Sequence, residues 1–394
     1  MAPRDTATGV GAAVGVAAAA VGAAATGAAV ERAARLRARV PGPPRAELFE
    51  HLPGQELTVV TTDGVKLHVE VDDPRDATDP LGHSGADRPT VVLCHGFTLN
   101  LRAWVFQRRA LTAAGYRVVT WDQRSHGRSG PAEAASCTIE QLGEDLAAVL
   151  AETCPSGPLA LVGHSMGGMT LMSFAEQQPE VVRERVLAAA FVATSAGGEG
   201  LTSLGLGVLA GKVIGRVGPD LLGRLGRHQE RLVRFRRFGR NLEDSLVERW
   251  SFDSPVSRDL VRFAGDMIFS TSLDVMGSFL PSLGTLDAAA ALDNFSGIET
   301  LVINGEGDLL TPPNHSEAIV RLVPGAEHVV LTEAGHLIML EHPDLVSEQL
   351  LLLVERGQRA HAGHTAVAAA PRVRRTVTDV RRRREVRAGL GTGA

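Results

Sequence analysis

The stretch LVGHSMGGMT at residues 161–170 decides the fold. It places Ser165 between Gly163 and Gly167, after a short apolar run and before a segment of helical length. A serine on a sharp strand-to-helix turn needs small neighbours, and the turn presents its hydroxyl to a crevice. The chain contains 43 glycines, so the pattern alone is a weak signal and the rest of the sequence has to supply its context.

Short, continuously apolar runs alternate with helix-length segments from about residue 56 onward. The runs are PTVVLCHG, YRVVTWD, LALVG, RVLAAAFVAT, ETLVING and EHVVLTEAG, and the helical segments cover about 101–114, 138–152, 166–178, 314–322 and 343–356. Such runs are typical of strands buried on both faces of a parallel sheet. The preceding ELTVVTTDGVKLHVEV predicts an antiparallel hairpin that turns at Asp63–Gly64. We therefore expect an α/β fold, with a mostly parallel sheet of about eight strands flanked by helices.

The amino-acid composition changes along the chain and predicts four kinds of segment. The predicted segments are an Ala/Gly-rich leader and linker at 1–45, a core at 46–195 and 296–357, a helical cap inserted at 196–295, and a basic tail at 358–394. We expect the tail to be disordered because it is rich in Arg, Ala and Val without a clear apolar pattern. The cap should cover the sheet and determine the substrate.

Two segments raise the question of membrane contact. Residues 7–30 carry no charge and are long enough to span a bilayer, but they are almost entirely Ala and Gly. A soluble tail, a membrane-contacting helix and a cleaved signal all remain open for them. Residues 223–240 are basic with interleaved Leu, Val and Phe, which suits either an anionic lipid surface or a solvated helix face. We expect a cytoplasmic protein, with peripheral membrane contact through these segments or the basic tail as an open alternative.

The charge balance and the cysteines exclude several classes of function. The net charge is −5, which does not favour a nucleic-acid partner. The cysteines Cys94, Cys137 and Cys154 form no disulfide framework, and no CxxC or Cys/His cluster suggests a metal site. We expect no metal and no cofactor.

A serine nucleophile requires a base, an acid that orients the base, and an oxyanion site. His336 follows the last predicted strand in TEAGHLIMLEHPD, and Asp308 follows the preceding strand in LVINGEGDLLTPP. Because the carboxyl ends of parallel strands meet at one edge of a sheet, both side chains should lie near Ser165. Asp122 and Asp293 are competing acids, but Asp122 is better suited to bracing the loop near the oxyanion turn.

The predicted oxyanion donors are the backbone N–H groups of Phe97 and Met166. His95 and Gly96 shape the turn that carries Phe97, while Gly163, His164 and Gly167 complete the nucleophile turn. We expect His95, His126 and His164 to pack these turns, with a substrate contact as the alternative.

With these motifs in this order, the chain resembles the α/β-hydrolase superfamily, in particular its serine esterase and lipase-like branch. The likeness covers about residues 57–355 except the cap. Its motifs are HGF (95–97), DQRSHGRS (122–129), GHSMGG (163–168), GEGD (305–308) and GHLIMLEHP (335–343). The chain departs at Ser125, where the family commonly has glycine, and at Glu299, where a proline is frequent.

The resemblance implies a catalytic triad of Ser165, Asp308 and His336. Epoxide hydrolases and haloalkane dehalogenases of this superfamily use aspartate at the position of Ser165, which argues against both activities. The epoxide branch also typically needs cap tyrosines, whereas the only tyrosine here, Tyr116, lies outside the predicted cap. We expect hydrolysis of a hydrophobic or lipid-like carboxylic ester through an acyl-serine intermediate. A carbon–carbon bond hydrolase, a perhydrolase, a thioesterase and a hydrolase-fold binding protein remain alternatives.

Overall fold

The structure is a computed structural model that describes residue 49, residues 54–74, 88–198, 243–363 and 374–382, and residue 384. The predicted leader, including residues 7–30, and the basic residues 223–240 lie outside the described residues. So do most of the first half of the predicted cap and residues 385–394 of the tail. The predictions for these segments therefore stay predictions.

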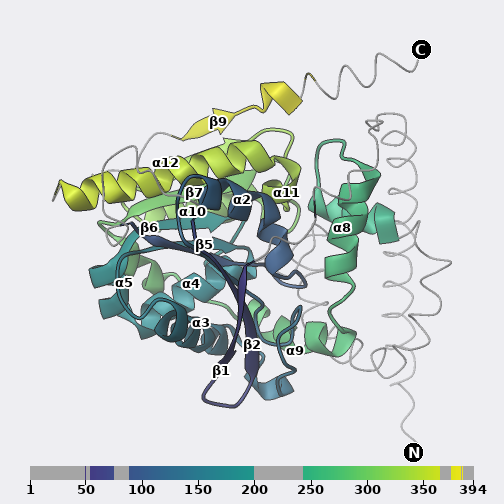
Figure 1. Cartoon of the computed structure of the whole chain (residues 1–394). Helices are drawn as coiled ribbons and strands as arrows, with labels where there is room; N and C mark the ends of the chain where they lie inside the picture. The colour runs from purple at the N-terminus through teal and green to yellow at the C-terminus, as the bar shows by residue number, and fades with distance from the viewer. Residues whose placement is uncertain are drawn as a thin grey trace, which may run out of the picture.

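The core is a mixed, mostly parallel sheet of nine strands, one more than the number expected (Figure 1). Its order is β1-β2-β4-β3-β5-β6-β7-β8-β9. The predicted hairpin is confirmed: β2 runs antiparallel to both β1 and β4, and the other pairs are parallel. The strands are β1 (Gln55–Val60), β2 (Lys66–Asp72), β3 (Thr90–Cys94), β4 (Val118–Trp121), β5 (Leu159–His164), β6 (Val186–Val192), β7 (Glu299–Gly305), β8 (Glu327–Leu331) and β9 (Arg375–Val377).

Helices cover both faces of the sheet, and each face has its own apolar cluster. Along β3, Val91 and Leu93 join one cluster, whereas Val92 and Cys94 join the other, because successive side chains of a strand point to opposite faces. One face packs against α2 (Val105–Ala113), α11 (Ile338–Glu341) and α12 (Pro343–Ala362). The other packs against α3 (Ile139–Thr153), α4 (Met166–Gln177), α5 (Pro179–Arg185), α10 (Pro313–Leu322) and the 3₁₀ helix η5 (Ala290–Phe295). This arrangement confirms the predicted α/β layering.

The described part of the predicted cap contains α8 (Arg258–Ile268) and α9 (Leu273–Gly284), which lie at the right of the sheet in Figure 1. Each helix begins with a serine whose side chain accepts a backbone hydrogen bond, from Leu260 N–H to Ser257 and from Val275 N–H to Ser272. Such caps satisfy amide groups that have no partner within the helix. Phe263 and Met267 of α8 are buried in the same cluster as α2 and α12, so ordinary packing accounts for both side chains.

The carboxyl-terminal part of the chain differs from the disorder expected after residue 357. The helix α12 continues to Ala362, and β9 adds a strand to the edge of the sheet beside β8. The physical reason is that β8 would otherwise present unpaired backbone groups. The basic residues also find acidic partners, since Arg374 pairs with Glu317 at 2.7 Å and Arg375 pairs with Glu327.

Among the described helices, none has both the length and the apolar character needed to cross a bilayer.

Candidate active site

Ser165 occupies a strained turn between β5 and α4. Its backbone has φ 51° and ψ −117°, a conformation that is rare for a residue with a side chain. The turn is fixed from both sides, because Ser165 N–H donates to the Val192 carbonyl at 3.0 Å and its own carbonyl accepts from the Thr194 hydroxyl at 2.6 Å. Strain that the surrounding structure holds in place is typical of functional sites.

The glycines of the motif permit this close packing. A Cβ atom at Gly167 would lie 2.2 Å from the Cys94 carbonyl oxygen, and one at Gly163 would lie 2.4 Å from the Gly167 carbonyl oxygen. Both obstacles are backbone atoms, which cannot rotate away. The small residues are therefore required by the approach of β3 and α4, as the sequence suggested.

Asp308 and His336 form the hydrogen-bonded pair that the sequence predicted. His336 Nδ1 lies 2.9 Å from Asp308 Oδ2, and both residues are buried. Asp308 is held by further donors: Oδ1 accepts from the N–H groups of Leu310 (2.8 Å) and Thr311 (2.9 Å), and Oδ2 accepts from the Thr311 hydroxyl (2.9 Å). Because a carboxylate only accepts, His336 Nδ1 carries a proton and Nε2 has a free lone pair.

The pair lies next to the Ser165 turn. The rings of His336 and His164 are 4.7 Å apart, and His164 Nε2 donates to the His336 carbonyl at 3.0 Å. Ser165 itself is half-buried, and within the described part of the chain no hydrogen bond joins its Oγ to His336. Catalytic hydrogen bonds are often long in the absence of substrate and shorten when it binds.

The turn that carries Phe97 lies against the Ser165 turn. A Cβ atom at Gly96 would lie 3.1 Å from Ser165 Cβ, so the two segments touch because Gly96 has no side chain. His95 braces the turn: its Nδ1 donates to the Gly96 carbonyl (2.8 Å), and its Nε2 accepts from Gln123 N–H (2.9 Å). Phe97 N–H donates to no acceptor among the described residues.

Met166 is the first residue of α4, where an amide has no acceptor within its helix. The N–H groups of Phe97 and Met166 thus remain available in adjacent turns, as the predicted oxyanion donors should be.

Three of the other histidines of the motifs, His95, His126 and His164, are neutral in the folded protein. Burial lowers the pKa of His95 to about 3, with His126 nearby adding to the effect, and burial lowers the pKa of His126 to about 4. Burial also lowers the pKa of His164 well below its ordinary value. All three are buried and packed on aromatic or imidazole rings, which agrees with their predicted packing role.

The competing acids have other partners. Asp122 accepts from the N–H groups of Leu101 and Arg128, both at 2.8 Å, and so braces the loop beside the oxyanion turn. Asp293 is exposed and accepts from the hydroxyl of Ser296. Neither carboxylate contacts His336, so Asp308 is the acid that the geometry favours.

The sequence did not reveal a second serine–histidine pair. Ser195, which follows β6, lies 2.8 Å from Nδ1 of His315 on α10. Both residues are buried, and Ser195 has no exposed surface. No short motif marks this pair, because its members are 120 residues apart. Ser195 is completely buried, whereas Ser165 is half-buried and therefore accessible to solvent.

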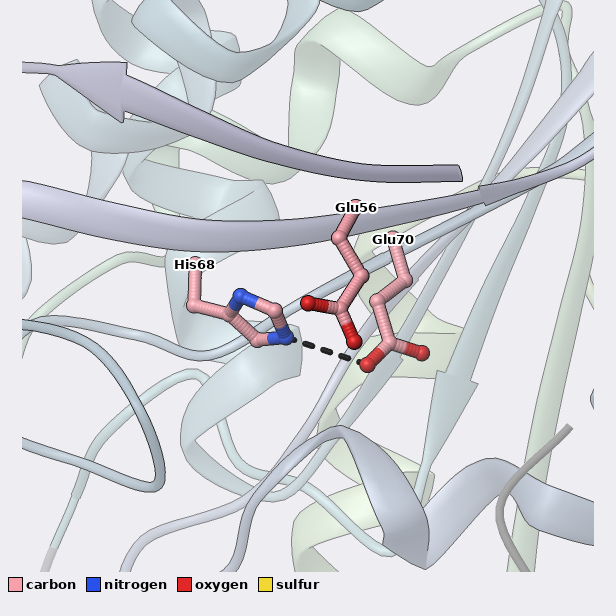
Figure 2. Close-up of side chains that lie close together, drawn as sticks. All are labelled: Glu56, His68 and Glu70. Carbon is pink, nitrogen blue, oxygen red and sulfur yellow. Dashed lines mark hydrogen bonds and ion pairs between the residues drawn. The ribbon is translucent and has the colours of Figure 1, made fainter. Parts of the chain in front are cut away.

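Glu56, His68 and Glu70 form a group whose side-chain atoms could hold a metal ion (Figure 2). His68 Nε2 lies 3.0 Å from Glu70 Oε1. The carboxylates already have cationic partners, because Glu56 accepts two hydrogen bonds from Arg128 and Glu70 accepts one from Arg108. Arg108 also donates two hydrogen bonds to Asp72, so the group is part of an ion-pair network of three carboxylates and two arginines.

The comparisons with known proteins identify the family and the fold. The family model for the alpha/beta hydrolase fold matches residues 89–343. The chain is 26% identical over 260 residues to the sn-1-specific diacylglycerol lipase ABHD11 of Mus musculus, which covers 66% of this chain and 78% of that protein.

Solved structures with the same fold include a thermophilic esterase from Thermogutta terrifontis. That structure has a TM-score of 0.57, 22% identity, and coverage of 77% of this chain and 99% of the esterase. A bromoperoxidase from Bacillus anthracis has a TM-score of 0.60, 20% identity, and coverage of 76% and 100%. At these identities the structures establish the shared fold. The chain belongs to the α/β-hydrolase superfamily.

Proposed function

We propose that the protein is a serine hydrolase that cleaves carboxylic esters, with Ser165 as nucleophile, His336 as base and Asp308 as the acid that orients the base. The observation that carries the proposal is the strained Ser165 turn beside the buried Asp308–His336 pair. The relationship to hydrolases supports the reaction class, because esterases and a lipase are among the similar proteins.

The geometry suggests how the reaction would proceed. His336 Nε2 accepts the Ser165 proton as Oγ attacks the ester carbonyl, and Asp308 stabilises the imidazolium that forms. The N–H groups of Phe97 and Met166 donate to the developing oxyanion. The protonated His336 then gives its proton to the leaving alcohol, and water repeats the sequence to release the acid from Ser165.

A hydrophobic acyl group is the substrate that the surroundings favour. The ring of Phe97 lies 6.0 Å from that of Phe279 on α9, and Phe279 packs in an apolar cluster with Met166 and Met169. The cluster places apolar side chains directly beside both proposed oxyanion donors. Phe279, Met166 and Met169 are buried, but Phe97, Val275 and Leu286 keep part of their surface exposed at the border of this cluster. An apolar acyl chain would be stabilised against these exposed parts, whereas a charged one would lose hydration there.

A series of nitrophenyl esters of increasing acyl length tests the reaction and the acyl preference together. We expect wild-type turnover to rise from the acetate to medium-chain esters and to disappear in Ser165→Ala. Ser195→Ala is the matched control, since it removes a buried hydroxyl with its own histidine partner and should keep most of the activity.

The same series separates the alternatives. Turnover of the acetate alone would contradict the hydrophobic acyl group. Faster cleavage of matched thioesters would favour a thioesterase, and peracid formation from peroxide and a carboxylic acid would favour a perhydrolase. No turnover of any ester would favour carbon–carbon cleavage or a binding protein. Peripheral membrane contact through 7–30, 223–240 or the tail remains a prediction.

A further inference from the structure

Residues 374–382, here called the C-terminal clasp, lie along the edge of the sheet next to the loop that carries His336. The clasp begins with β9, which pairs in parallel with β8 (Figure 1). The contact continues past the strand, because Thr332 N–H donates to the Val377 carbonyl at 3.0 Å. The strand β8 leads directly into residues 332–337, here called the histidine loop. The clasp therefore contacts this loop at Thr332, the first residue of the loop.

A first chain of hydrogen bonds runs from the clasp to Glu333. Asp379 Oδ2 lies 3.2 Å from His342 Nδ1, and His342 Nε2 donates to the Glu333 carbonyl at 2.9 Å. Glu333 has φ 56°, a left-handed conformation that needs support from its surroundings. Burial raises the pKa of Asp379, but hydrogen bonds from Arg382 N–H and His342 outweigh it and hold the pKa below its usual value.

A second chain of contacts runs from the clasp to Gly335. Arg382 donates from Nε to the Ser254 hydroxyl (3.2 Å) and from Nη2 to the Pro255 carbonyl (3.0 Å). The Ser254 hydroxyl donates to Glu341 Oε1 (2.7 Å), and Glu341 Oε2 accepts from Gly335 N–H (2.7 Å). The buried Glu341 therefore joins residue 254, from the predicted cap, to the loop residue that precedes His336.

The two chains of contacts converge on the backbone of Glu333 and Gly335, immediately before His336. On the other side of His336, Leu337 N–H donates to the Ser251 carbonyl at 2.9 Å. The contacts described above link Asp379 and Arg382 to the loop through other residues, so we expect them to affect the chemistry through the position of the loop. Asp379 also accepts from Arg382 N–H at 2.9 Å, which ties the origins of the two chains together.

We propose that Asp379 and Arg382 are positioning residues for the base His336, and that the C-terminal clasp is needed to align the active site. The inference rests on the proposed function of Ser165 and His336. A displacement of the order of 1 Å in a reacting group lowers a rate by about 100-fold. Loosening the histidine loop should therefore slow proton transfer from Ser165 without removing the substrate-binding surface.

Arg382→Ala tests the proposal against a matched control in the same segment. We expect kcat for a nitrophenyl ester, and the rate at which a fluorophosphonate labels the protein, to fall by about 10- to 100-fold with little change in KM. Arg381→Ala makes the same charge change at the neighbouring residue, whose side chain is 79% exposed and pairs with the exposed Asp344. This variant should keep kcat and the labelling rate within about twofold of the wild-type values, because exposed ion pairs contribute little to the stability of a fold.

Asp379→Ala and Arg382→Lys provide independent readouts. Asp379→Ala should lower kcat in the same way, since it removes the support of His342. Arg382→Lys keeps one donor for Ser254 or Pro255 and should recover part of the lost rate, which a general loss of packing would not predict. Thermal unfolding of each variant, followed by circular dichroism, shows whether the fold is retained.

The outcomes distinguish this inference from the proposed function. If Ser165→Ala is labelled as fast as wild type, Ser165 is not the nucleophile and both proposals fail. If labelling requires Ser165 but Arg382→Ala and Asp379→Ala react at the wild-type rate, only the positioning role is contradicted. Equal losses in Arg382→Ala and Arg381→Ala would also contradict it, because they would reflect charge rather than the contacts of Arg382.

Discussion

The Ser165 turn and the His336 loop are held in place in different ways. The Ser165 turn depends on residues inside its own motif, since Gly163 and Gly167 allow the close contacts of β5, α4 and β3. The His336 loop depends on residues far away in the sequence, which reach it through Glu341 and His342. The tertiary fold holds both halves of the proposed active site, but the glycines that the Ser165 turn requires can be identified from its motif, whereas Asp379 and Arg382 cannot be identified from the motif of His336.

Asp308→Asn should give the largest effect of the variants that test this comparison. The asparagine amide can donate to His336 Nδ1, which would move the imidazole proton to Nε2 and leave no lone pair for the Ser165 proton. We expect kcat to fall by about 10⁴-fold, the size found when a triad acid is made neutral. Steady-state kinetics measure the loss, and a decrease below tenfold would remove Asp308 from the proposed triad.

Gly167→Ala tests the Ser165 half. The new Cβ would lie 2.2 Å from the Cys94 carbonyl oxygen and 2.8 Å from the His95 carbonyl oxygen, and these backbone atoms cannot rotate away. We expect the free energy of unfolding to fall by more than about 3 kcal/mol, as measured in urea. Gly265→Ala in α8 is the control, because its Cβ would meet Val247 Cγ2 at 3.5 Å, an ordinary van der Waals contact. A loss at Gly167 no larger than at Gly265 would contradict the requirement for a glycine in the turn.

Glu341→Gln tests the His336 half. Glu341 accepts hydrogen bonds from Asp253 N–H, Ser254 N–H, the Ser254 hydroxyl and Gly335 N–H, whereas a glutamine amide nitrogen would face one of these donors. We expect a loss of about 1–3 kcal/mol in unfolding free energy and a decrease of about tenfold in kcat.

Glu348→Gln, on the exposed side of α12, should change neither quantity. Wild-type stability and kcat in Glu341→Gln would show that the histidine loop does not need this support.

His95→Gln should give the smallest effect at neutral pH, because it changes how stability depends on pH below about 6.5. Burial holds the pKa of folded His95 at about 3, while the unfolded chain binds a proton near pH 6.5. Between these values the unfolded state carries the extra proton, so this histidine makes stability fall as the pH decreases. The slope from one such residue is about 1.4 kcal/mol per pH unit between pH 6 and 4.

Urea unfolding at several pH values should show a shallower slope in His95→Gln than in wild type. An unchanged slope would mean that His95 takes up its proton without leaving the fold.

The sequence predicted the local features of the molecule well. The apolar runs that became β3–β8 and the hairpin at Asp63–Gly64 follow from short-range patterns, as does the Ser165 turn. Asp308 and His336 could be selected because both follow strands whose carboxyl ends meet at one edge of the sheet.

The distant supports could not be predicted in the same way. No local pattern links Arg382 with Ser254, which are 128 residues apart, or Ser195 with His315. The strand β9 has three residues and lies in a basic region without apolar alternation. Its place depends on the exposed edge of β8 and on acidic partners such as Glu327, which only the folded chain brings together.

Mass spectrometry after fluorophosphonate treatment tests the role of Ser165 most directly. Wild-type protein should gain the mass of one phosphonyl group, and peptide mapping should place it on the peptide that contains Ser165. Ser165→Ala should gain none under the same conditions, while Ser195→Ala should react like wild type. A phosphonyl group on any other residue of the wild-type protein, or equal labelling of Ser165→Ala, would contradict the assignment of Ser165 as the nucleophile.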